Sequence, residues 1–141
     1  MKHLLALGAV CAILSAPAGI AADITLIDAD NLAWETTPEG VSFAALQGDR
    51  FQGAYQAMVR LPAGTISPAH VKTATMFGVV LRGEMTHYGK DADPASAQAI
   101  GPGAFYRIPG GLAHVSACVS SVPCVTYLYQ DAAFDFVPVA Q

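Results

Sequence analysis

Charged residues are scarce in this chain of 141 residues, where Asp, Glu, Lys and Arg make up 13% of the total. A typical globular chain carries about 25%. Hydrophobic residues reach 53%, a composition that argues against disorder. The 7 Lys and Arg residues are scattered and are outnumbered by 11 Asp and Glu residues, which gives a net charge of −4. Because there is no basic run or basic face, the sequence excludes a nucleic-acid partner held by charge.

Long apolar runs are also lacking after residue 22, so the mature chain has no segment able to span a membrane. Before it, Lys2 precedes an apolar run over residues 4–14, and Pro17 and a series of small residues end that run at Ala22. This pattern is typical of a cleaved secretory signal peptide. We therefore expect a signal peptide over residues 1–22, one domain over residues 23–141, and a periplasmic or secreted protein. The alternative is an uncleaved membrane anchor, because residues 4–22 approach spanning length.

Cysteine is rare, with three residues in the whole chain. Cys11 lies inside the predicted signal peptide, which leaves Cys118 and Cys124 in the mature protein. An exported protein meets an oxidising compartment, and this spacing allows two cysteines to face each other across a hairpin. The sequence predicts a disulfide between them; the alternative is a pair of buried thiols.

Helical periodicity is missing as well, so an alternating α/β fold is disfavoured. Short apolar segments recur about every ten residues between glycine and proline residues, which is typical of an all-β sandwich or barrel. The expected strands include a short one within residues 23–34, followed by 41–46, 54–61, 66–72, 76–82, 84–88, 104–108, 112–118, 124–130 and 134–139.

Two sets of residues have spacings of interest: Gly64, His70 and Gly83, followed by Gly103, Pro109, Gly111 and His114. Both sets resemble the two sequence motifs of the cupin superfamily. The segments at 77–85 and 101–106 add a likeness to small secreted single-domain cupins with no assigned activity. The resemblance implies a cupin-type jelly-roll β-barrel with a site inside the barrel mouth, and a homodimer. It does not imply a reaction, because one fold hosts many functions.

The sequence departs from the cupin motifs at the metal ligands. The resemblance implies three histidines and one glutamate around a first-row metal such as Fe, Mn, Ni or Zn. Here Lys72 and Met76 stand at one histidine position and at the glutamate position, so His70 and His114 remain. These two are either metal ligands or polar groups that line a metal-free pocket. Met76 either fills space or joins both histidines in a Cu(I) site.

Lys72 shares a strand face with His70, because side chains alternate along a strand. An ammonium repels a divalent cation and has no free lone pair, so Lys72 argues against a conventional metal site. Three alternatives follow. The ammonium takes the place of the metal and holds an anionic ligand, or it turns out through the barrel mouth with its stem on the apolar wall, or it is a desolvated, reactive amine.

Two further residues are candidates for the site. If Met85 faces the core, His87 does so too, and it is then either a substitute third metal ligand or a hydrogen-bonded histidine at a strand end. Tyr106 lies on an expected strand and is a candidate for the pocket wall.

The expected function is the binding of a small anionic organic molecule in the barrel, with His70, Lys72, His114 and Tyr106 in the site and a metal absent or weakly bound. The alternative is a metal-dependent cupin enzyme, a dioxygenase or isomerase, that uses His70 and His114 with His87 or Met76. A third interpretation, a structural or interaction protein, requires a filled barrel without a cavity.

Overall fold

The computed structural model describes residues 23–140, so the predicted signal peptide lies outside the described residues. Two short 3₁₀ helices, Ala29–Asn31 and Pro94–Ser96, accompany ten strands. Neither helix is long and apolar enough to cross a membrane, and residues 23–140 contain no other helix. The strands are β1 (Trp34–Thr36), β2 (Ser42–Gln47), β3 (Tyr55–Leu61), β4 (His70–Val71), β5 (Met76–Arg82), β6 (Met85–Gly89), β7 (Phe105–Ile108), β8 (His114–Cys118), β9 (Cys124–Gln130) and β10 (Val137–Pro138).

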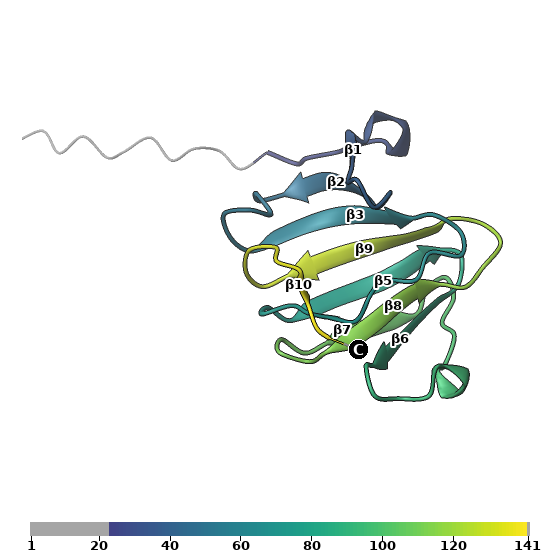
Figure 1. Cartoon of the computed structure of the whole chain (residues 1–141). Coiled ribbons are helices and arrows are strands. Elements are labelled where there is room, and N and C mark those ends of the chain that lie inside the picture. Colours follow the sequence, from purple (N-terminus) through teal and green to yellow (C-terminus); the bar gives the residue numbers. More distant parts are fainter. Residues whose placement is uncertain (1–22, 141) are drawn as a thin grey trace, which may run out of the picture.

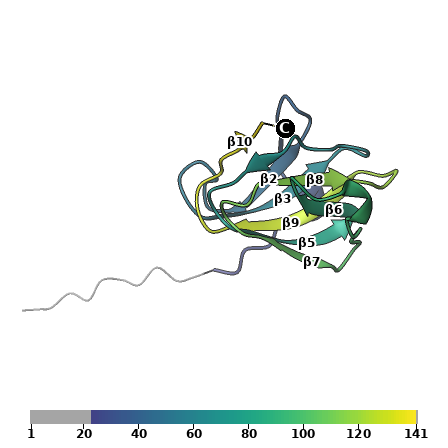
Figure 2. The same cartoon turned by 60° about the horizontal axis from the view of Figure 1, so that its bottom comes forward.

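The strands form two antiparallel sheets that lie one over the other (Figure 1, Figure 2). The larger sheet has the order β1-β2-β3-β9-β5-β7, and the smaller has the order β10-β4-β8-β6. Consecutive strands repeatedly cross from one sheet to the other, as in a jelly roll. The predicted all-β jelly-roll barrel is therefore confirmed.

Alternating side chains explain how the larger sheet holds the core. In β3 the side chains of Tyr55, Ala57, Val59 and Leu61 are buried, and those between them are more exposed. The central strand β9 shows the same period of two along its whole length. Such alternation places one apolar face against the opposite sheet. The core is therefore a layer between the sheets, and the cavity described below lies within it.

The C-terminal segment, residues 131–139, includes β10, which lies next to β4 at the edge of the smaller sheet. Val137 and Pro138 pair with Val71 and His70, and the Val139 N–H donates to the Ala69 carbonyl. Residues 137–139 are thus fixed against the strand that carries the first-motif histidine.

Three expected strands differ from those observed. Within residues 23–34 the chain forms the 3₁₀ helix instead, because the Asp28 carboxylate caps it by accepting from the Asp30 N–H. The strand expected at 66–72 shrinks to β4, since Pro68 has no N–H to donate to a neighbouring strand. The strand expected at 134–139 shrinks to β10. Residues 134–136 form isolated hydrogen bonds through side chains and single backbone groups, and not the regular ladder of a strand.

The predicted disulfide is confirmed. Cys118 and Cys124 are bonded, with Cα atoms 5.7 Å apart, and both residues are almost completely buried. The bridge joins the end of β8 to the start of β9 and so ties the smaller sheet to the larger one.

Candidate functional site

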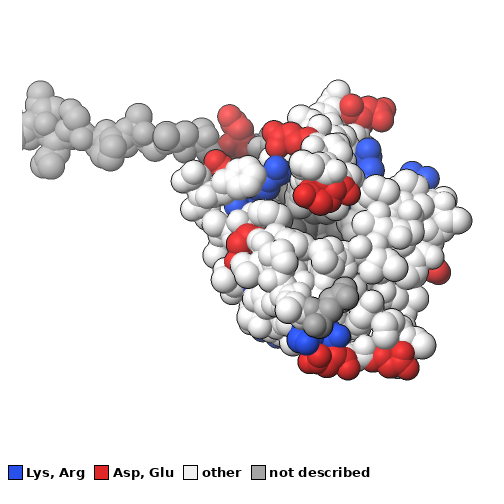
Figure 3. All heavy atoms as spheres, viewed as in Figure 1, with Lys and Arg blue, Asp and Glu red and all other residues white. Residues whose placement is uncertain are grey.

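A cavity of about 600 Å³ lies between the sheets. In the space-filling view, the molecule has a hollow whose upper rim carries both acidic and basic side chains (Figure 3). Most of the lining side chains are apolar, and a smaller number are polar. The polar ones are Thr37, Glu39, Thr65, Ser67, His70, Lys72, His87, Ser116 and Thr126. A mostly apolar wall with a few polar groups is the usual composition of a small-molecule site.

The smaller sheet brings three histidines together on neighbouring strands. His70 on β4 pairs directly with His114 on β8, and their ring centroids are 4.3 Å apart. His87 on β6 pairs with Ser116, which places it diagonal to His114. His70 and His87 line the cavity, whereas His114 is 2% exposed and does not line it.

Hydrogen bonds fix the tautomers of His70 and His114. The Nδ1 atom of His70 lies 2.9 Å from the Pro68 carbonyl, and that of His114 lies 2.9 Å from the Leu112 carbonyl. Because a carbonyl oxygen only accepts, both Nδ1 atoms carry hydrogen, and both Nε2 atoms keep a lone pair. The Nε2 atoms of His87 and His114 are buried without a hydrogen-bond partner in the described part of the chain.

All three imidazoles are neutral at pH 7. Burial lowers the pKa of His70 and of His87 to about 4, because the charged form loses its hydration. Burial also lowers the pKa of His114. Neutral imidazole both accepts and donates a hydrogen bond, so the three rings add polar groups without adding charge to this part of the barrel.

Lys72 also lines the cavity, and at 7% exposure it does not extend into solvent. Its ammonium donates to the Asp135 carbonyl and lies 3.8 Å from the centroid of the Phe134 ring. The Asp135 carboxylate instead accepts from the Thr73 N–H at 3.1 Å. Burial lowers the pKa of Lys72 to about 8, while the charge of Asp135 opposes that shift. The C-terminal segment therefore holds this side chain at the cavity wall.

Tyr106 lines the cavity from β7. Its hydroxyl lies 3.1 Å from the Thr126 Oγ1 atom, and its ring lies 4.3 Å from that of His87. Burial raises the pKa of Tyr106 to about 12, so the phenol is protonated at neutral pH. The ring fits because residue 78 is glycine: a Cβ atom there would lie 2.2 Å from the Tyr106 Cζ atom.

The donors around the cavity do not fit a metal ion. His70 and His114 have the tautomer that a metal requires, but the next position holds the Lys72 ammonium. Within residues 23–140, no group of three or more His, Cys, Asp or Glu side chains could hold a metal. Met76 and His87 both line the cavity, and they provide one thioether and one imidazole.

Two aromatic residues of the C-terminal segment belong to the site although the sequence did not predict them as site residues. Phe134 and Phe136 both line the cavity, and the Phe136 ring stacks on His70 with centroids 4.1 Å apart. The alternating sequence Phe-Asp-Phe at 134–136 indicates that both phenylalanines share one face. It does not indicate that this face contacts Lys72.

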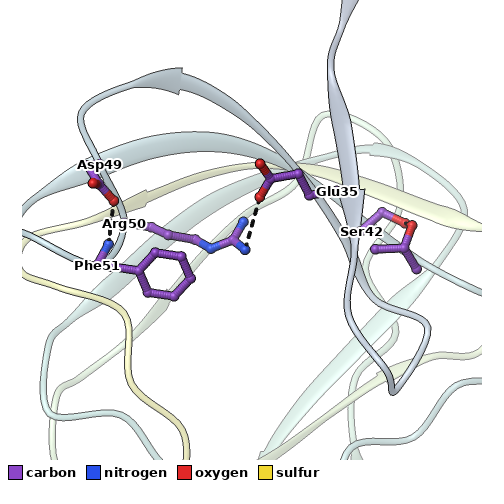
Figure 4. A network of polar contacts seen from close by, with 6 residues as sticks. Glu35, Ser42, Asp49, Arg50 and Phe51 are labelled. Atoms are coloured by element: carbon purple, nitrogen blue, oxygen red, sulfur yellow. Dashed lines mark hydrogen bonds and ion pairs between the residues drawn. The ribbon is translucent and has the colours of Figure 1, made fainter.

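A second, smaller pocket of about 360 Å³ lies beside the turn before β3. There the Arg50 guanidinium lies 3.3 Å from the Glu35 carboxylate and against the ring of Phe51 (Figure 4). The Phe134 N–H donates to the Arg50 carbonyl. This turn therefore supports the C-terminal segment at the end that faces Lys72.

Comparisons with known proteins agree with this architecture. The polyketide cyclase RemF from Streptomyces resistomycificus is similar, with a TM-score of 0.66 and 16% identity over 84% of this chain and 87% of that chain. KdgF from Halomonas sp. has a TM-score of 0.60 and 14% identity over 76% of this chain and 94% of that chain. At such identities the likeness shows the fold alone.

The structure of Rhodobacter sphaeroides SigE in complex with the anti-sigma ChrR is also similar, with a TM-score of 0.57 and 21% identity. The match covers 74% of this chain and 52% of that chain. No curated protein matches the sequence significantly. The family model described as the ChrR cupin-like domain matches residues 22–133. This chain therefore belongs to the ChrR cupin-like domain family.

Proposed function

We propose that this cupin domain binds a small organic molecule inside its barrel, and that the molecule is largely apolar and carries one anionic group. The cavity between the sheets is the observation that carries the proposal, because its size suits a small ligand and its lining is mostly apolar. A structural or interaction role does not require such a cavity.

The charged residues that line the cavity support an anionic group on the ligand. Lys72 is the buried charged residue of the cavity lining, whereas Glu39 is exposed at the rim. A buried charge interacts more strongly than an exposed one, because water screens it less. Below a pH of about 8 the Lys72 ammonium is present.

We expect naphthalene-2-carboxylate to bind about tenfold more tightly than 2-naphthalenemethanol, a difference that one partly desolvated charge pair readily supplies. Both probes have the same apolar body, so their affinities isolate the effect of the charge. Isothermal titration calorimetry at pH 7 measures both.

The matched control uses the other described lysine. Lys72→Met should remove the preference for the carboxylate and keep binding of the alcohol. Lys90→Met should change neither, because Lys90 lies on the surface in an ion pair with Asp91. Equal affinities in the wild type argue against an anionic ligand, and failure of both probes to bind a folded protein contradicts the proposal.

We also propose that the barrel holds no metal tightly, because Lys72 stands where the cupin resemblance implies a ligand. The wild-type protein, purified without chelator, should contain less than about 0.1 equivalent of Fe, Mn, Ni, Zn or Cu by mass spectrometry. Lys72→His combined with Met76→Glu should raise the affinity for Zn²⁺ by at least about tenfold. A stoichiometric metal in the wild type that disappears in His70→Ala and His114→Ala would instead support the metal-dependent enzyme.

We also propose that the protein is exported. The predicted signal peptide and the buried Cys118–Cys124 disulfide both suit an oxidising compartment outside the cytoplasm.

A further inference from the structure

Lys72 has surroundings that are unusual for a lysine. The ion pairs within residues 23–140 are Arg50–Glu35 and Lys90–Asp91, so Lys72 is buried without a carboxylate partner. Its contacts are the Asp135 carbonyl and the rings of Phe134 and Phe136. Lysine is almost never buried unless it is paired. Binding of an anion explains why the site has a positive charge. It does not explain why the Lys72 amine has no carboxylate partner in the free protein.

The contact with Asp135 orients the amine whether or not it is charged. A neutral amine has two hydrogens and one lone pair, so it can still donate one hydrogen to the Asp135 carbonyl. The side chain therefore keeps its place at the cavity wall when the lone pair is free. A lysine amine in apolar surroundings is the usual nucleophile in Schiff-base chemistry.

We propose that Lys72 forms a reversible imine with an aldehyde or ketone bound in the barrel cavity, which rests on the ligand-binding function proposed above and names the reactive group of the ligand. The Lys72 lone pair forms a bond to the carbonyl carbon, and the carbonyl π electrons move to oxygen. That oxygen takes a proton from the new ammonium to give a carbinolamine. The proton that the Lys72 ammonium gave to water before the attack then returns to the hydroxyl group. The nitrogen lone pair forms the C=N bond as the C–O bond breaks and water leaves, and the nitrogen keeps its one remaining hydrogen as a protonated imine.

This step balances without another reagent, because an ammonium and a carbonyl compound give an iminium ion and one water. The iminium ion keeps one positive charge and one N–H. The Asp135 carbonyl is placed to accept from that N–H, and the Phe134 ring faces the charge at the 3.8 Å separation already described. An oxo acid suits the site well, since its carboxylate stays close to the positive nitrogen.

The lysine content of the chain makes a direct test simple. The three lysines are Lys2, Lys72 and Lys90, of which Lys2 lies in the predicted signal peptide and Lys90 is on the surface. The protein is incubated with 2-naphthaldehyde and sodium cyanoborohydride, which reduces an imine to a stable secondary amine. Peptide mass spectrometry then gives the rate of modification at each lysine. We expect Lys72 to react about tenfold faster than Lys90, because the cavity holds the aldehyde beside the amine.

Two variants and one competitor control the test. Lys72→Arg keeps a cation at the cavity wall and cannot form an imine, so it should lose the fast modification and remain folded. Lys90→Arg should keep the fast modification of Lys72. An excess of naphthalene-2-carboxylate should protect Lys72 in the wild type.

The outcomes separate this inference from the ligand-binding function. Modification of Lys72 no faster than that of Lys90 in a folded protein that still binds naphthalene-2-carboxylate would overturn the imine and leave the binding function intact. Fast modification of Lys72 that the carboxylate does not slow would also overturn it, because the reaction would then not depend on the cavity. Absence of both binding and modification contradicts both proposals.

Discussion

Acidification from pH 7 to pH 4 should remove several kcal/mol from the free energy of unfolding. The pKa of His70 and of His87 is lowered to about 4 in the folded protein, against 6.5 in the unfolded chain. As the pH falls below 6.5, the unfolded chain takes up protons that the folded protein does not, so unfolding becomes more favourable. The loss is complete once the pH is below the folded pKa. Each histidine contributes on the order of 2 kcal/mol, and His114 acts in the same direction.

Urea denaturation at a series of pH values measures this effect. The unfolding free energy should fall steadily between pH 6.5 and 4, as the unfolded chain takes up protons that the buried histidines do not. The variant His87→Gln removes one of the titrating rings while it keeps a polar side chain beside Ser116, so its stability should depend less steeply on pH. A wild-type stability that is flat from pH 7 to 4 would contradict burial of neutral histidines.

The variant Gly78→Ala should be destabilised by about 3 kcal/mol, as expected when an atom is forced into a packed core. A Cβ at position 78 would lie 2.2 Å from the Cζ atom and 2.3 Å from the hydroxyl of Tyr106. Tyr106 is buried and bonded to Thr126, so it cannot move aside without loss of that hydrogen bond. The displaced ring would also enter the cavity, and binding of naphthalene-2-carboxylate should weaken together with stability.

Gly53→Ala is the matched control, because a Cβ at that position meets nothing within 4 Å. Its melting temperature should remain close to that of the wild type. Tyr106→Leu combined with Gly78→Ala should cost less than the sum of the two single changes, because the shorter side chain relieves the clash. If Gly78→Ala alone is as stable as Gly53→Ala, the position of the Tyr106 ring is wrong.

The barrel was predictable because its motif residues act locally. Gly64 and Gly83 have φ values of +72° and +76°, which a residue with a Cβ rarely adopts. The spacing of these glycines therefore indicates where tight turns separate the strands. The disulfide was predictable for the same reason, since Cys118 and Cys124 are only six positions apart. Such features depend on short stretches of chain.

The candidate site was only partly predictable, because it depends on contacts between distant residues. The sequence indicated that Lys72 shares a face with His70, and both side chains line the cavity. It did not indicate that the partner of Lys72 is Asp135, which is 63 residues away. It also did not distinguish His114, which is covered by its neighbours, from His87, which reaches the cavity. Those differences follow from how the sheets and the C-terminal segment close over one another.

The position of β9 determines when this protein can acquire its structure during synthesis. In the larger sheet β9 lies between β3 and β5, and it pairs with both along nearly its full length. Residues 124–130 are made after β3 and β5, so the two halves of the larger sheet remain unjoined until β9 has left the ribosome. Pairings over such long sequence distances also form slowly. Strands β3 and β5 therefore share one later partner, and the larger sheet cannot close strand by strand in the order of synthesis.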